Sequence, residues 1–154
     1  MADKIFTGAT SGDWSVAGNW LSGSAPVAAD NIFFVADYNI DLTAGLDQSA
    51  VTYGKLIVES GYTGKIGTKI AYLQIVCTDV DFKGSGESYI DVSTSAIDIR
   101  VDGTAAAPTG KSGLYLKGSA IDEVNVISGR GNCNGNNDKR QWRKYRCGRW
   151  MHLN

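Results

Sequence analysis

Apolar and polar residues alternate along most of the chain, as in β-strands that have one buried and one solvated face. In residues 97–101, three apolar residues fall on one side of an extended chain, while Asp98 and Arg100 fall on the other. The spacing typical of amphipathic helices is nearly absent. The sequence therefore predicts an all-β protein. The clearest predicted strands are residues 56–58, 72–77, 89–92, 97–101, 114–117 and 124–127.

Short turn segments rich in Gly, Ser and Thr separate these runs, as at residues 60–61, 84–86 and 118–119. Short, interrupted strands suit a sandwich, a barrel or a solenoid. A short parallel β-solenoid is favoured, because few connections look like two-residue hairpins and the segments between residues 56 and 129 resemble one another. No strict repeat length is apparent, and an antiparallel β-sandwich or jelly roll remains the alternative.

The pattern divides the chain into three regions. Residues 1–50 form an N-terminal cap with the first strands, residues 51–129 form the solenoid body, and residues 130–154 form an irregular basic C-terminal arm. A solenoid must block the free edge of its first rung, so Trp14 and Trp20 are expected to pack within the cap rather than to face a ligand.

The arm differs from the body in charge. It holds seven Lys/Arg and one acidic residue, a net charge of +6, whereas residues 1–129 hold eight Lys/Arg and fifteen Asp/Glu, a net charge of −7. Three interpretations stay open: an arm that docks on an acidic neighbouring subunit, a nucleic-acid-binding arm, or an extension translated out of frame. The candidate partner-binding residues are Arg140, Trp142, Arg143, Tyr145, Arg146, Arg149 and Trp150.

Length and composition limit the class of protein. The 154 residues suit one domain, and 43% hydrophobic and 20% charged residues lie in the range of folded proteins. No apolar run approaches the about 18 residues of a membrane-spanning helix, and the first residues lack a signal-peptide pattern. The three cysteines are expected to be thiols in a reducing cytoplasm.

The sequence offers little for catalysis. The single histidine is His152, so a buried histidine dyad or triad has no place. Asp79 with Asp81, and Asp98 with Asp102, are acidic pairs that more often solvate a strand than serve a glycosidase. Zinc binding by Cys133, Cys147 and His152 lacks a clear fourth ligand, and residues 110–112 lack the rest of a phosphate loop. We therefore expect no enzyme activity, no metal and no cofactor.

The opening of the chain carries a recognisable motif. The spacing Gly12-x-Trp14-Ser15-x-x-x-Asn19-Trp20-x-x-Gly23-x-x-Pro26-x-x-x-Asp30 resembles one that heads many parallel β-helix proteins, both secreted bacterial proteins and phage proteins. Residues 45–52, 61–67 and 72–75 look like the phage branch, and the resemblance covers residues 4–129. It implies structural cap roles for Trp14, Asn19, Trp20, Pro26 and Asp30.

The resemblance also implies a function. It suggests a structural bacteriophage virion protein, assembled in the host cytoplasm, most often a capsid decoration or cement protein. The implied partners are the major capsid protein or other virion subunits, in a homo-oligomer for which a trimer is favoured. One alternative is a tail or fibre adhesin that binds host carbohydrate through exposed tyrosines, and another is a nucleic-acid-binding protein acting through the basic arm. The candidate tyrosines are Tyr53, Tyr62, Tyr89 and Tyr115.

Overall fold

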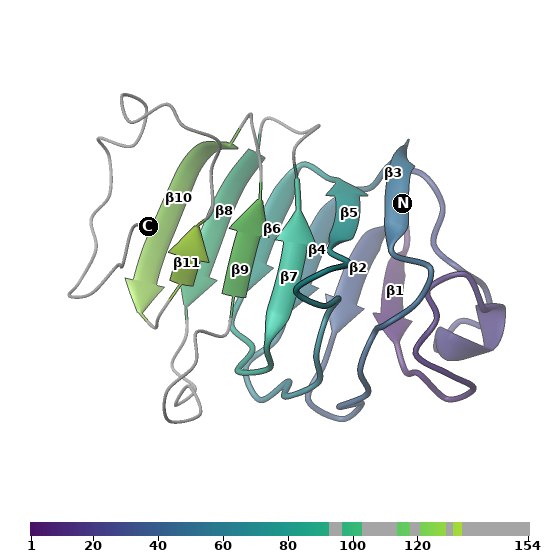
Figure 1. Ribbon diagram of the computed structural model, residues 1–154. Helices are drawn as coiled ribbons and strands as arrows, with labels where there is room; N and C mark the ends of the chain where they lie inside the picture. The colour runs from purple at the N-terminus through teal and green to yellow at the C-terminus, as the bar shows by residue number, and fades with distance from the viewer. Residues whose placement is uncertain (93–96, 103–113, 118–120, 129–130, 134–154) are drawn as a thin grey trace.

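The computed structural model describes residues 1–92, 97–102, 114–117, 121–128 and 131–133. These residues form β-strands joined by turns, with a single 3-10 turn, η1, at Ala17–Asn19. The strands stack into a parallel β-solenoid of about 4 turns, which confirms the predicted fold class. Figure 1 shows the strands side by side along the solenoid axis, with the N-terminus at one end and the last strands at the other.

Two parallel sheets form the walls of the solenoid. The first sheet contains β1 (Asp3–Phe6), β2 (Asn31–Phe34), β4 (Lys55–Val58), β6 (Asp79–Phe82), β8 (Ile97–Asp102) and β10 (Ile121–Ser128). The second contains β3 (Asp47–Thr52), β5 (Leu73–Val76), β7 (Ser88–Asp91), β9 (Leu114–Lys117) and β11 (Gly131–Cys133). From β2 onward each rung contributes one strand to each sheet, whereas β1 has no counterpart strand in the second sheet.

Strands β2, β4 and β6 repeat with a fixed spacing that the sequence did not reveal. Ile32 pairs with Leu56, and Leu56 pairs with Val80, so each of these two steps is 24 residues, whereas the step from Asp3 in β1 to Asn31 is 28 residues. The same 24-residue offset joins the turns, where the backbone N–H of Lys65 donates to the Asp41 carboxylate at 2.7 Å. The repeat is one of backbone conformation and not of sequence, because equivalent positions hold residues of similar polarity but different type.

A third set of backbone contacts between rungs lies at the corner between the two sheets. Leu42 bridges Ile66, and Ile66 bridges Ser88, each in parallel. Neighbouring rungs approach so closely here that a Cβ on Gly86 would overlap the carbonyl oxygen of Gly64. Glycine is therefore required at this corner for the rungs to stack.

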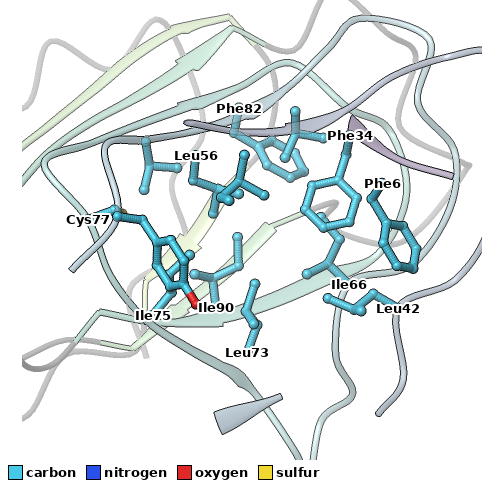
Figure 2. Close-up of a cluster of buried hydrophobic side chains, with 14 of the residues drawn as sticks. Phe6, Phe34, Leu42, Leu56, Ile66, Leu73, Ile75, Cys77, Phe82 and Ile90 are labelled. Atoms are coloured by element: carbon cyan, nitrogen blue, oxygen red, sulfur yellow. The ribbon is translucent and has the colours of Figure 1, made fainter. Parts of the chain in front are cut away.

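The core fills the space between the two sheets (Figure 2). In β2, β4, β5 and β6, alternate residues point inward, as the i, i+2 pattern requires. Burying each large apolar side chain stabilises the fold by about 1.5–3 kcal/mol. The fully buried apolar residues include Phe6, Ile32, Phe34, Leu42, Leu56, Val58, Ile66, Leu73 and Ile90.

Each of the six runs that the alternation marked as strands overlaps one of the strands β4, β5, β7, β8, β9 and β10, although the runs 72–77 and 89–92 extend past the observed ends of β5 and β7. The antiparallel sandwich alternative is wrong, because every pair of neighbouring strands is parallel. One boundary also differs from the expectation. Residues 131–133, placed in the irregular arm, form β11 and pair with β9, so the strand stack continues past residue 130.

Candidate contact surfaces

The N-terminal end of the solenoid is closed by the chain itself. Residues 19–21 run antiparallel to β1: the backbone N–H of Leu21 donates to Ile5 at 2.9 Å, and that of Thr7 donates to Asn19 at 2.7 Å. The backbone N–H of Trp14 donates at 3.1 Å to the carbonyl oxygen of Ala44, which lies in the segment before β3. The edge of the first rung is thereby withheld from other chains.

An aromatic cluster packs beneath this closure. Trp14 and Trp20 are each only 2% exposed, and their rings meet edge to face with centroids 4.9 Å apart. Trp20 also packs edge to face on Phe6 at 5.3 Å, and Trp14 packs on Tyr53 at 5.6 Å. The Trp20 indole N–H donates to the Trp14 carbonyl at 2.8 Å, so its polar atom is satisfied. Both tryptophans lie inside the cap and face no solvent.

Asn19 is the polar centre of the cap. Its side chain is fully buried, and its Oδ1 accepts hydrogen bonds from the backbone N–H groups of Thr10 and Ser11, each at 2.8 Å. Its Nδ2 donates to the Ser11 hydroxyl at 3.0 Å and to the Asp13 carbonyl at 2.7 Å. The amide thus uses both donors and both lone pairs to hold the loop of residues 10–13 in place.

Asp30 fixes the chain terminus against the cap. Its Oδ1 accepts from the backbone N–H of Ala2 at 2.8 Å, and its Oδ2 accepts from Val27 at 3.1 Å. Burial acts to raise the pKa of Asp30, but these two N–H groups and the Lys4 ammonium together hold that pKa below its usual value. Pro26, in the same segment, is buried.

The outer face of the first sheet carries a polar ladder. Asn31 donates from Nδ2 to Asp3 at 2.9 Å and accepts the backbone N–H of Lys55 at 3.0 Å. The Lys55 ammonium lies 3.5 Å from Asp79 one rung further along. These polar groups bind one another across rungs.

The outer face of the second sheet carries a row of aromatic rings. Tyr72, Tyr89 and Tyr115 come from three successive rungs, and we call them the tyrosine row. The Tyr89 and Tyr115 rings are nearly parallel, 6° apart in plane and 4.4 Å apart in centroid, and Tyr72 meets Tyr89 edge to face at 5.3 Å. The Tyr89 hydroxyl donates to Glu87 at 2.7 Å.

Two of the four tyrosines considered for sugar binding are core residues. Tyr53 and Tyr62 are buried, and their hydroxyls donate to Gln48 at 2.8 Å and to the Ile40 carbonyl at 2.7 Å. Burial raises the pKa of each hydroxyl. The expectation that these two rings are exposed is wrong, because both turn inward, between the strands. It is also wrong for Tyr89, which lies on the outer face but is only 7% exposed, and Tyr115 is half-buried.

The acidic pair Asp79 and Asp81 is on the outer face of β6, where each carboxylate lies near a lysine. The Asp81–Lys83 distance is 3.0 Å, and Asp79 faces Lys55. Across the described ranges, no group of three or more His, Cys, Asp or Glu side chains could hold a metal ion. Burial raises the pKa of the Cys77 thiol to about 12, so this cysteine is protonated at neutral pH.

Several sequence-derived candidates lie outside the described residues. These are the arm residues Arg140, Trp142, Arg143, Tyr145, Arg146, Arg149 and Trp150, the zinc candidates Cys147 and His152, and residues 110–112. Within the described part of the chain, no helix is long and apolar enough to cross a membrane.

The chain matches no family model, no curated protein and no solved structure.

Proposed function

We propose that this protein is a structural component of a bacteriophage virion that binds the capsid shell through protein–protein contacts, as a decoration or cement protein does. It would assemble in the host cytoplasm, as a homo-oligomer for which a trimer is favoured, with the major capsid protein as its principal partner. The contact itself, and no chemical step, would be the function.

The observation that carries this proposal is the construction of the N-terminal end. The motif that resembles phage β-helix proteins supplies the buried residues that close the first rung: Trp14, Asn19, Trp20, Pro26 and Asp30. The motif residues therefore close the N-terminal end of the strand stack. Such a stack presents long, fixed outer faces, which suits a protein that adds rigidity to a shell.

The polar ladder on the outer face of the first sheet supports the same proposal. Side chains such as Asn31, Lys55 and Asp79 pair with one another along the rungs. Pairs of this kind hold the register of the stack, and surface pairs contribute little to stability individually.

The charge division supports a partner that is acidic. A body of net charge −7 and an arm of net charge +6 would orient a subunit against an acidic neighbour. Because such contacts are electrostatic, salt should weaken them.

Co-sedimentation with capsids that lack this protein tests the proposal. The full chain should pellet with the capsids at low salt. A full-length variant with Arg140, Arg143, Arg146 and Arg149 changed to Gln should be released at moderate salt, whereas the matched Arg→Lys variant should stay bound. Failure of the unmodified chain to pellet would contradict the virion role, and equal retention of the Gln variant would contradict the role of the arm. Preferential binding to DNA with a steep salt dependence would favour the nucleic-acid alternative.

A further inference from the structure

The outer face of the second sheet carries two parallel rows of side chains. The strand register aligns Gln74 with Asp91 and Asp91 with Lys117, two residues beyond the tyrosine row on the same strands. Because side chains alternate between faces, and the neighbouring Leu73, Ile90 and Leu114 on these strands are buried, both rows point outward. We call Gln74, Asp91 and Lys117 the polar row.

The tyrosine row has a buried centre and accessible ends. Tyr89 is 7% exposed, because Tyr72 and Tyr115 pack against it from the two sides. Tyr72 and Tyr115 themselves are only half-buried and keep surface for a ligand. The hydrogen bond from Tyr89 to Glu87 and the ion pair of Lys117 with Asp91 at 2.8 Å hold both rows in place before any ligand arrives.

We propose that this face binds a linear oligosaccharide, with Tyr72 and Tyr115 packing against the sugar rings and Gln74 and Lys117 bonding their hydroxyl groups. This is a binding activity in addition to the proposed virion role. A pyranose ring has an apolar C–H face and a rim of hydroxyls, and an aromatic row beside an amide and an ammonium complements both.

The spacing of the rungs supports a chain-like ligand. Parallel strands lie about 4.8 Å apart, so each row offers one side chain at about that interval along the solenoid axis. A pyranose unit in an extended oligosaccharide has a comparable length. Tyr72 and Tyr115, the accessible ends of the tyrosine row, lie two rungs apart. A sugar chain lying along the axis would therefore meet them with residues about two units apart.

The charges on this face favour a neutral or weakly charged ligand over a nucleic acid. This face contains the carboxylates of Glu87 and Asp91. Among its described residues, the ammonium of Lys117 is the one positive charge beside them. Phosphate groups placed here would be repelled by both carboxylates. The hydroxyl groups of a sugar carry no such penalty.

Titration of the full chain with cellohexaose, chitohexaose, maltohexaose and isomaltohexaose tests this site, by calorimetry and by NMR chemical-shift mapping. At least one should bind, with shifts centred on Tyr72 and Tyr115. Tyr72→Ala and Tyr115→Ala should each weaken that binding by about tenfold. Tyr38→Ala, which removes another half-buried tyrosine in the turn after β2, should leave it unchanged.

Gln74→Ala and Lys117→Ala provide a second pair of variants that remove no ring, in case a tyrosine variant unfolds. Absence of binding to all four sugars would overturn the assignment. So would binding that all of these variants leave unchanged, or stronger binding of a single-stranded oligonucleotide by the same face. Capsid co-sedimentation is measured separately, so loss of the sugar site would leave the proposed virion role standing.

Discussion

The protein contains two aromatic clusters that serve different physical purposes. In the cap, Trp14 and Trp20 are enclosed by the chain, and their contacts continue through Tyr53 into the core. In the tyrosine row, the rings of Tyr89 and Tyr115 stack on the outside of a sheet. Both clusters join successive rungs, but only the first removes the end of the solenoid from water.

The difference shows that aromatic content alone does not distinguish core from surface in a solenoid. Rings at the cap gain from burial, since an uncapped first rung would expose both apolar side chains and strand edges. Rings on the outer face stabilise the fold mainly through their contacts with each other. Three comparisons between variants test how the cap differs from the outer surface.

Replacing a cap ring should have the largest effect. Trp20→Ala removes a fully enclosed side chain and should lower the free energy of unfolding by about 3–5 kcal/mol. Tyr115→Ala removes a half-buried ring from the outer face and should cost about 1 kcal/mol. Urea unfolding followed by far-UV circular dichroism measures both. Equal losses would show that the two clusters contribute alike.

Loss of the polar centre of the cap should have the next largest effect. Asn19→Ala leaves the backbone N–H groups of Thr10 and Ser11 without their acceptor inside the cap, at a cost of about 2–3 kcal/mol. Asn39→Ala is the matched control, because exposed Asn39 accepts the backbone N–H of Thr63 at 2.6 Å. Water can replace that bond, so the control should lose less than about 1 kcal/mol. A similar loss in the two variants would argue against a special role for Asn19.

The smallest expected effect is the contribution of Asp30 to the free energy of unfolding, which depends on pH. The pKa of Asp30 is lowered in the folded chain, so the carboxylate contributes stability that is present above its unfolded pKa, 3.8, and is lost as the pH falls through the folded value. Asp30→Asn lacks this contribution. The difference in unfolding free energy between the two chains should therefore be largest above about pH 4 and shrink below it.

Urea unfolding at several values between about pH 7 and about pH 3 measures this difference. Among the described residues, the other carboxylates with lowered pKa values are Asp13 and Asp47, and these titrate in both chains and so cancel in the comparison. A difference that stays constant over the whole range would exclude an electrostatic role for Asp30.

Much of the strand content could be predicted from local pattern. Alternation in residues 73–76 and 97–102 depends only on one face being buried, and both segments are strands. The 24-residue repeat could not be found in the same way, because Ile32, Leu56 and Val80 are interchangeable in the core and leave no identical residues to align. The spacing also differs at β1, where Asp3 pairs with Asn31, and after β6, where Asp79 pairs with Asp98.

The sites were less predictable than the strands. A tyrosine has an apolar ring and a polar hydroxyl, so it suits either side of a strand. The sequence could not show that Tyr62 turns inward to reach the Ile40 carbonyl while Tyr89 stacks outward. Nor could it show that Tyr72, Tyr89 and Tyr115 are neighbours, because their spacing along the chain is uneven.

The sequence by itself determined that the chain forms short strands with one apolar face, since this follows from residue order and the two-residue period of an extended backbone. Only the tertiary structure decided that these strands pair in parallel and which tyrosines reach the surface. Both depend on hydrogen bonds and contacts between residues on different rungs, which are far apart in sequence, and local alternation carries no information about them.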